Sequence, residues 1–363
     1  MKSILVINAL NGVFPLVLRK KYPDARITCA EVFPFYKHHL RNLGFEVVDW
    51  EGLTDMKFDM VVGNPPYQKD NNSGRDDDNL WPKFLSRSHE LVKQGGHIAL
   101  VTPASWGSLG SNPAAPGSTI RKKYFDNCQV LYVDFTCKKH FDVGSSFSAY
   151  VLRKLPVDSN VKTRFVFGSG TVDADFSDHM CFPLSHSDSV FGEIIAHFRS
   201  QVPYQMVAED PYPVARSSMV KKLAQGDYSD QPTETHLYRA YHTNSQTHKY
   251  SAHKNKFHNK WKAVFSYSGS WNVEVTNDCS LTDASMCVVC KTEAEAESVK
   301  SVLTSAPIKF LIDKVYRWSG YYSGSFIRMI PALPMTKIYT EQEVYDLLFT
   351  KSQQTVLKKL MKV

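Results

Sequence analysis

The chain has 363 residues, of which 43% are hydrophobic and 12% aromatic, enough to bury two cores of ordinary domain size. It starts without a charged-then-apolar leader and contains no run of about 18 apolar residues, so neither secretion nor a membrane span is indicated. The net charge is +7, and the seven cysteines follow no disulfide framework, which favours a reducing, cytoplasmic location.

Strand-like and helix-like segments alternate through the first 154 residues. The predicted strands are residues 4–8, 27–31, 45–48, 58–63 and 97–102, and the clearest helices are residues 35–43 and 80–92. Two further strands, at 130–135 and 147–152, have no crossover signal between them and are expected to form a hairpin-like pair. This alternation of strands and helices predicts an α/β fold with a doubly wound, mostly parallel sheet.

The alternation stops after residue 154, which suggests a second domain. The rest of the chain contains a β-like run at 164–167, a stretch rich in His, Tyr and Lys, and a helix at 293–303. We therefore expect a boundary near Pro156, with domains 1–155 and 156–363 and a mixed α+β fold in the second.

Four of the predicted strands end in a polar residue or are directly followed by one, and doubly wound sheets bind their ligands over such ends. Glu31 is placed to accept hydrogen bonds from a ribose diol, and Asp49 from the exocyclic amine of an adenine. The turn at Asn11-Gly12 can approach a ligand through its backbone. We predict a nucleoside-bearing cofactor, and its expected contacts are Asn8, Ala9, Asn11, Gly12, Glu31, Val32, Asp49 and Asn64.

The tetrapeptide Asn64-Pro65-Pro66-Tyr67, which we call the Asn64 loop, comes directly after the fourth predicted strand. Its prolines fix φ and remove two backbone donors while leaving their carbonyl oxygens free. Asn64 adds a side-chain amide oxygen, and Tyr67 adds a flat ring. The loop is predicted to accept hydrogen bonds from a planar amine; a plain Pro-rich turn is the alternative.

These motifs, in this order, resemble the S-adenosylmethionine-dependent adenine-N6 DNA methyltransferases of the gamma class, the TaqI-like group. Residues 95–106 and 141–152 are similar to further segments of that family, and residues 302–307 and 330–334 are similar to the ends of its C-terminal target-recognition region. The resemblance implies a Rossmann-like methyltransferase fold, S-adenosylmethionine as cofactor, double-stranded DNA as partner, and a prokaryotic or phage-encoded protein. It also implies that residues 156–363 recognise the target.

The mechanism that the resemblance implies is direct methyl transfer to a flipped-out adenine. The Asn64 side-chain oxygen and the Pro65 carbonyl would accept the two hydrogens of the target amine, and Tyr67 with Phe141 would sandwich the base. The sequence departs from the family in its first turn, where only Gly12 remains of several small residues and Asn8 stands where a carboxylate is common.

Basic and aromatic residues are interleaved between residues 236 and 262, which is typical of a phosphate-contacting segment, although a solvated loop would look alike. The predicted DNA contacts are Lys138, Lys139, Arg239, Lys249, Lys254, Lys256, Lys260, Trp261 and Arg317. We expect no metal site, because Cys287 and Cys290 have CxxC spacing without a second pair.

The sequence thus favours a site-specific DNA adenine-N6 methyltransferase and leaves alternatives open. One is a methyltransferase-like DNA-binding subunit with weak or no catalysis, because the first turn is so changed. Another is a methyltransferase that acts on RNA or on a protein glutamine, since those enzymes share the Asn64 loop. A partner subunit or a homodimer, the recognition sequence and a cognate nuclease are left undetermined.

Overall fold

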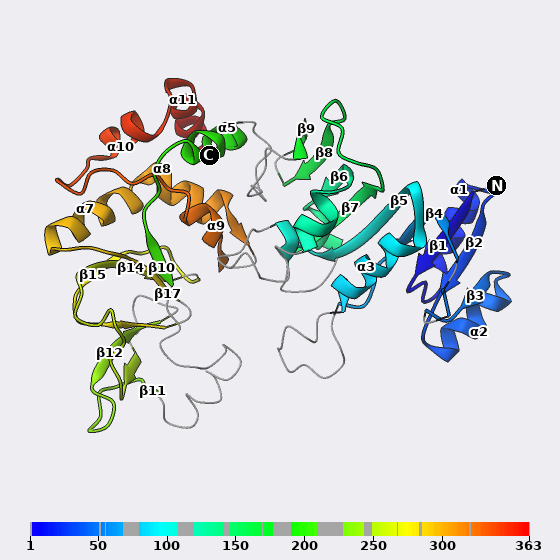
Figure 1. Cartoon of the computed structure of the whole chain (residues 1–363), viewed down its shortest axis with the longest axis horizontal. Coiled ribbons are helices and arrows are strands. Elements are labelled where there is room, and N and C mark those ends of the chain that lie inside the picture. Colours follow the sequence, from blue (N-terminus) through cyan, green and yellow to red (C-terminus); the bar gives the residue numbers. More distant parts are fainter. Residues whose placement is uncertain are drawn as a thin grey trace. The chain divides into compact units, whose positions relative to one another are not determined.

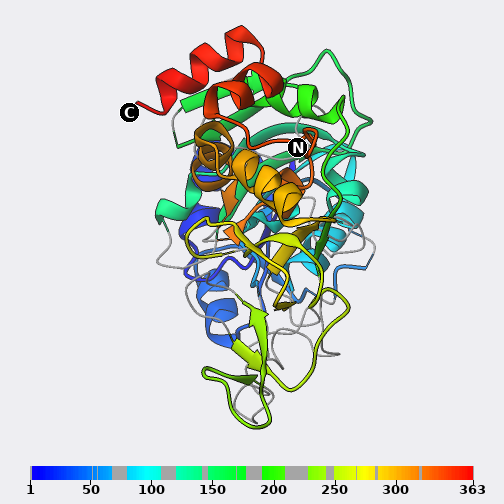
Figure 2. The same cartoon turned by 90° about the vertical axis from the view of Figure 1, so that its left-hand side faces the viewer.

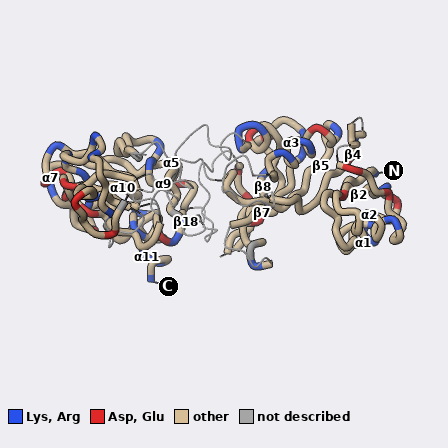
Figure 3. The backbone as a smooth tube through the Cα atoms, turned by 90° about the horizontal axis from the view of Figure 1, so that it is seen from below, with Lys and Arg blue, Asp and Glu red and all other residues tan. Residues whose placement is uncertain are grey.

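The computed structural model describes most of the chain as two compact units, Met1–His179 and Met180–Val363 (Figure 1). The described residues are 2–50, 52–54, 56–67, 80–107, 120–140, 146–168, 170–176, 190–208, 228–242, 249–266, 268–282, 285–318 and 321–362. Within both units Lys and Arg are interspersed with Asp and Glu along these parts (Figure 3).

A nine-stranded sheet forms the centre of the first unit, in the order β3-β2-β1-β4-β5-β7-β6-β8-β9. Its strands are β1 (Ser3–Ile7), β2 (Arg26–Ala30), β3 (Glu46–Val48), β4 (Phe58–Gly63), β5 (Val92–Pro103), β6 (Gln129–Asp134), β7 (Phe147–Arg153), β8 (Thr163–Phe167) and β9 (Gly170–Ala174). The five strands from β3 to β5 are parallel, and β7 runs antiparallel between β5 and β6. This confirms the predicted doubly wound, mostly parallel sheet and the hairpin-like pair.

Three described helices connect the parallel strands: α1 (Val13–Lys21), α2 (Pro34–Asn42) and α3 (Trp81–Leu91). Leu18 of α1 and Leu40 of α2 are buried against the apolar side chains of β1 and β2, such as Val6. The α3 helix contacts β4 and β5 instead. Each helix therefore buries apolar side chains against the sheet, as a doubly wound sheet requires.

The predicted boundary at residues 155/156 is wrong, because the sheet continues past it. The β8 strand pairs in parallel with β6, and β9 pairs antiparallel with β8. Phe165 and Phe167 of β8 are buried, and the ring of Phe167 stacks on that of Phe135 with centroids 5.6 Å apart. The end of the strand–helix alternation after residue 154 thus marks a hairpin added to the edge of the sheet. The boundary between the two units lies at residues 179/180.

A close approach between β1 and β4 places the Asn64 loop. Gly63 pairs with Ile7, and a Cβ atom on Gly63 would lie only 2.4 Å from the Ile7 carbonyl oxygen. Real side chains essentially never come that close to a backbone atom, so this position needs glycine. The next residues along the two strands, Asn8 and Asn64, are consequently neighbours.

Replacing Gly63 with alanine should lower the free energy of unfolding by about 1–3 kcal/mol, because the strands must separate to admit the methyl group. Urea unfolding followed by circular dichroism measures the change. Gly52→Ala is the matched control, since its Cβ would meet the Asp49 carbonyl oxygen at an ordinary 3.5 Å. Equal stability of the Gly63 variant and the wild type would contradict the close approach.

The second unit is a mixed α+β body with two four-stranded sheets. One sheet has the order β10 (Met206–Ala208), β17 (Ser285–Val289), β14 (Lys262–Ser266) and β15 (Glu274–Thr276), and the other β11 (Tyr228–Ser229), β13 (Lys249–Ser251), β12 (Tyr238–Tyr241) and β16 (Ser280–Leu281). The strands β18 (Arg317–Trp318) and β19 (Tyr321–Tyr322) form a small pair. The helices are α5 (Val190–Arg199), α7 (Glu293–Leu303), α8 (Ala306–Phe310), α9 (Gly324–Ile327), α10 (Glu341–Leu348) and α11 (Lys351–Leu360).

Within this unit the helices gather at one end and the sheet that contains β12 lies at the other (Figures 1 and 2). The main core joins α5 to the β14–β17 sheet through residues such as Phe191, Phe198 and Phe265. The predicted helix at 293–303 is confirmed as α7, whose Thr292 side chain caps the first turn by accepting from the Glu295 N–H.

No helix in the described part of the chain is both long and apolar enough to cross a bilayer.

Candidate active site

The Asn64 loop and the turn after β1, residues 8–12, meet at the carboxyl end of the parallel strands. Nδ2 of Asn8 donates a hydrogen bond of 2.8 Å to the backbone carbonyl of Asn64. Both residues are half-buried, and Pro65 is buried behind them. The structure therefore brings together two of the residues that the sequence placed at separate strand ends.

The Tyr67 side chain closes the other side of the loop. Its hydroxyl donates a hydrogen bond to Oδ1 of Asn64, and its ring packs on Phe147 with centroids 4.8 Å apart and planes at 45°. Burial raises the pKa of Tyr67 to about 12, so the hydroxyl keeps its proton at neutral pH. Phe141, the second predicted stacking ring, lies outside the residues that the structure describes.

The turn at residues 8–12 has an unusual backbone. Asn8, Leu10 and Gly12 have φ values of 57°, 48° and 79°, in the left-handed region that favours Gly and Asn. The backbone N–H of Leu10 donates to Oε2 of Glu31 at 2.9 Å, and the carbonyl of Asn11 lies 3.2 Å from Nε2 of His39. The strained turn is thus held from outside by side chains of the following elements.

Glu31 is buried, with only 1% of its surface exposed. Besides the Leu10 N–H, its carboxylate accepts hydrogen bonds from the N–H groups of Val32, at 2.8 Å, and Phe33, at 3.1 Å. Each carboxylate oxygen can accept two hydrogen bonds, so Oε2 keeps capacity for one more beside Leu10. Sequence reasoning foresaw an acid at this strand end but not that it would organise the turn.

Asp49, by contrast, is exposed and forms an ion pair with Lys37 of α2. Its side chain is 62% exposed, and it does not line the apolar cavity beside Asn8 and Asn64. An adenine amine at this position would have to share the carboxylate with Lys37.

That apolar cavity has a volume of about 520 Å³. Its walls are Asn8, Ala9, Leu10, Asn11, Val13, Phe14, Val17, Gly63, Asn64, Ala99, Leu100, Val101, Tyr132, Ala149, Tyr150 and Val151. Sequence reasoning missed the contribution of α1, whose Val13, Phe14 and Val17 are exposed at 59%, 44% and 56%. The signal was available, because these three apolar residues share one side of a short helix.

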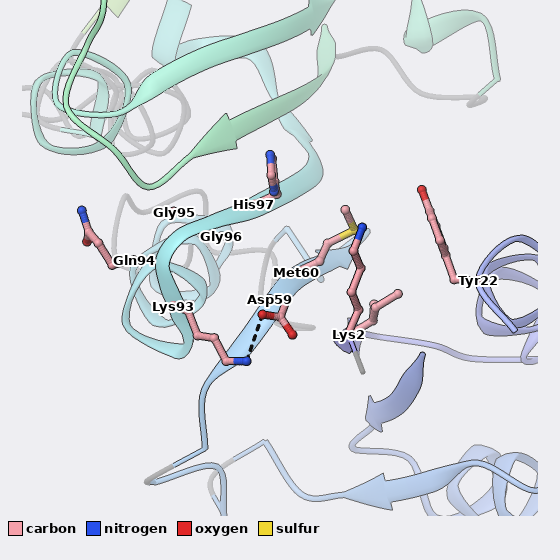
Figure 4. Close-up of a pocket in the computed structure, with 10 residues that line it drawn as sticks. Lys2, Tyr22, Asp59, Met60, Lys93, Gln94, Gly95, Gly96 and His97 are labelled. Atoms are coloured by element: carbon pink, nitrogen blue, oxygen red, sulfur yellow. Dashed lines mark hydrogen bonds and ion pairs between the residues drawn. The ribbon is translucent and has the colours of Figure 1, made fainter. Parts of the chain in front are cut away.

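A second cavity, of about 300 Å³, lies at the opposite, amino ends of β1 and β4 (Figure 4). Asp59 in its wall accepts from the Ser3 N–H at 2.7 Å and from Lys93 at 2.9 Å. These contacts, the Ser3 N–H first, lower the pKa of Asp59 to about 2. Its carboxylate therefore ties β1 to β4 and β5, and this cavity holds none of the predicted site residues.

In the second unit, the structure brings three of the predicted DNA contacts onto one turn. Lys254, Lys256 and Lys260 are exposed on residues 254–260, which lead into β14. The ammonium of Lys254 lies 4.8 Å from the centre of the Tyr238 ring. Beneath the turn, the fully buried Lys262 donates to the carbonyls of Phe257 and Lys260, each at 3.0 Å.

The other predicted DNA contacts are in different settings. Arg239 pairs with Glu274 at 3.0 Å, Lys249 pairs with Asp230, and Arg317 pairs with Asp313 at 2.8 Å. Trp261 packs against the main core of the second unit. Lys139 is exposed on a short helix of the first unit, and the side chain of Lys138 is outside the described part.

No group of three or more His, Cys, Asp or Glu side chains among the described residues is arranged to hold a metal ion. Cys287 and Cys290 are both buried at β17, where the Cys290 thiol donates to the Val288 carbonyl.

Comparison with known proteins gives one family match and several partial likenesses. A stretch of 54 residues is 37% identical to a Mycoplasma pneumoniae protein described as an uncharacterized adenine-specific methylase, and it covers 14% of this chain and 12% of that protein. Among solved structures, the M protein of the type I restriction enzyme EcoKI is 14% identical, with a TM-score of 0.36 over 53% of this chain and 49% of that one. A methyltransferase from Pyrococcus furiosus is 17% identical, with a TM-score of 0.28 over 42% and 75% of the two chains.

The chain thus spans about an eighth of the curated relative and about half of the EcoKI protein. The family match is longer: residues 19–141 fit the model of the Eco57I restriction-modification methylase. These residues run from the end of α1 through β2 to β6. Over this segment, which contains the Asn64 loop, the chain is similar to the Eco57I restriction-modification methylases.

Proposed function

We propose that the chain is an S-adenosylmethionine-dependent DNA methyltransferase that methylates the N6 amine of an adenine. The observation that carries the proposal is the Asn64 loop at the carboxyl end of β4, with the Asn64 backbone carbonyl bonded to Asn8 of the turn at residues 8–12. The family match over residues 19–141 supports it.

The residues around the turn suit a nucleoside-bearing cofactor. The left-handed turn leads through Gly12 into the amino end of α1, where the Val13 N–H donates to Asn11 Oδ1 at 3.3 Å and Pro15 has no N–H. The Phe14 N–H of this first turn is the proposed donor to a polar ligand atom. Glu31 Oε2 is the proposed acceptor for a ribose hydroxyl, and Asp49 for the adenine amine. When bound, S-adenosylmethionine supplies an electrophilic methyl group on its sulfonium.

In this proposal Asn64 prepares the amine of the target base. The amine is a poor nucleophile because its lone pair is delocalised into the ring. Hydrogen bonds from its two hydrogens to Asn64 Oδ1 and to the Pro65 carbonyl favour a more tetrahedral nitrogen. An amide oxygen has two acceptor sites, so Oδ1 can accept the amine while it retains the Tyr67 hydroxyl.

The second unit, in the proposal, selects the site in double-stranded DNA. The turn of residues 254–260 presents three exposed lysines and a neighbouring Tyr238 ring, which are the groups that contact phosphates and bases. Partner subunits or a homodimer are compatible with this division of roles.

A second candidate function is a methyltransferase-like DNA-binding subunit without catalysis. Two observations favour it: Glu31 is 1% exposed and already accepts three backbone hydrogen bonds, and the turn keeps only one glycine. Such a subunit would bind DNA but not the cofactor.

Calorimetric titration with S-adenosylmethionine separates the two candidates. The methyltransferase proposal predicts saturable heat with one site per chain, and S-adenosylhomocysteine should compete. No heat at high protein concentration, together with measurable DNA binding, would favour the non-catalytic subunit.

We expect Glu31→Ala to weaken S-adenosylmethionine binding by roughly 1–3 kcal/mol, because the variant loses the ribose acceptor and releases the Leu10 turn. Glu31→Gln retains one acceptor oxygen and should fall between this variant and the wild type. Calorimetry on both variants, with the exposed Glu90→Ala as the matched control, measures the loss. An unchanged dissociation constant in Glu31→Ala would remove Glu31 from the cofactor site.

A further inference from the structure

We propose that Asn8 is a positioning residue that sets the orientation of Asn64 through a hydrogen bond to its backbone carbonyl. The inference rests on the proposed methyltransferase function. The two residues are 56 positions apart in sequence, yet Asn8 Nδ2 lies 2.8 Å from the Asn64 oxygen. Both residues line the same cavity.

The backbone at Asn8 explains why few residue types fit there. Its φ of 57° is in the left-handed region, which Gly, Asn and Asp adopt most readily. Its own N–H donates to the Ala30 carbonyl at 3.0 Å, so the residue is anchored to β2 while its side chain reaches β4. Of those three residue types, Asn is the one whose side chain donates a hydrogen bond at every pH.

The backbone of the Asn64 loop is anchored at its far end, where the Leu80 N–H donates to the Tyr67 carbonyl at 2.9 Å. Pro65 and Pro66 have no N–H groups, so neither can anchor the loop by donating a hydrogen bond. The carbonyl that accepts the hydrogen bond from Asn8 belongs to the peptide group between Asn64 and Pro65. This group is planar, so a rotation of the group also moves the Asn64 Cα and its side chain. Holding this oxygen therefore helps to hold the direction of the amide that is proposed to accept the target amine, together with the Tyr67 hydroxyl that donates to Oδ1.

The same bond couples two parts of the site. Asn8 begins the turn that is proposed to contact the cofactor, and Gly63 allows β4 to approach β1 closely enough for the bond to form. A carboxylate at position 8, which is common in the resembling family, could not donate to a carbonyl. The geometry thus gives a physical reason for the asparagine.

Two substitutions that keep the backbone conformation test the role. Asn8→Gly removes the donor and should lower the single-turnover rate of methyl transfer roughly fivefold, the effect expected from one neutral hydrogen bond. Asn8→Asp places an ionised carboxylate against the carbonyl oxygen and should lower the rate at least roughly tenfold at about pH 8. The dissociation constant for S-adenosylmethionine should change less than the rate in both.

The pH profile separates positioning from a merely structural role. A protonated carboxyl group can donate to the Asn64 carbonyl, so the rate of Asn8→Asp relative to wild type should recover as the pH falls, whereas that of Asn8→Gly should not. Because the new carboxyl has a raised pKa in the folded protein, its stabilisation is present at low pH and lost as the pH rises. The melting temperature of Asn8→Asp should therefore exceed that of Asn8→Gly most at low pH.

Asn127→Asp is the matched control, since Asn127 is exposed and its Nδ2 also donates to a backbone carbonyl, that of Lys122 at 2.6 Å. This variant should keep the wild-type rate. If the wild type is active and the Asn8 variants methylate at its rate, the positioning role alone is overturned. The same holds if the rate of Asn8→Asp does not recover as the pH falls. A wild type that binds DNA but transfers no methyl group would overturn the proposed function and this inference with it.

Discussion

Asn64→Ala should reduce methyl transfer by roughly 10²–10³-fold or more, the loss expected when a preorganised hydrogen-bonding group is removed from a reacting centre. The structure makes the substitution a clean one. The hydrogen bond from Asn8 goes to the Asn64 backbone oxygen, so alanine keeps it. The hydrogen bond from Tyr67 goes to the Asn64 side chain, so alanine removes it. Fold and cofactor affinity should therefore change little.

Single-turnover assays with radiolabelled S-adenosylmethionine measure the rate, and calorimetry measures the cofactor affinity. Tyr67→Phe is a useful second variant, because it removes the hydroxyl that donates a hydrogen bond to Asn64 Oδ1 but keeps the Asn64 amide. Asn160→Ala, at an exposed turn distant in sequence, serves as the control. Near-wild-type turnover by Asn64→Ala would show that the loop does not act on the target amine.

Replacing Lys254, Lys256 and Lys260 together with glutamine should weaken DNA binding and flatten its dependence on salt. Each lost phosphate contact reduces the steepness of log affinity against log salt concentration by roughly 0.9. The slope of the triple variant should therefore be shallower than that of the wild type by up to about 2.7. Lys262, which lies buried beneath the turn and binds its carbonyls, is left intact, so the turn should keep its shape.

Fluorescence anisotropy with a labelled duplex at several salt concentrations measures the slope. The charge-matched control replaces Lys309, Lys359 and Lys362, three exposed lysines of the same unit. If the control lowers the slope as much as the triple variant, general charge and not this turn governs the affinity. An unchanged slope in the triple variant would place the DNA elsewhere.

Local patterns in the sequence were sufficient for the parallel strands. The mostly apolar run from Phe58 to Gly63, which Asn64 and two prolines follow, predicted a strand, and β4 has those bounds. The strand β8 was assigned to the wrong domain because an edge strand is defined by its partner. Nothing within residues 163–167 indicates that they pair with β6.

Three of the predicted site residues could be found from the sequence, but their contacts could not. Asn8, Glu31 and Asn64 were found as strand ends, yet the bond between Asn8 and Asn64 depends on the register of β1 and β4. The burial of Glu31 depends in turn on the left-handed turn that folds over it. Lys262 shows the same limit, because a buried lysine that binds turn carbonyls has no local signature.

The most direct test of the central claim is nucleoside analysis of duplex DNA after incubation with the protein and isotopically labelled S-adenosylmethionine. Mass spectrometry of the digested DNA identifies the methylated base, and the Asn64→Ala protein provides the blank. We predict label in N6-methyladenine, absent with Asn64→Ala. Label on cytosine, on RNA or on a protein glutamine instead, or no label from a protein that binds the cofactor and DNA, would contradict the assignment.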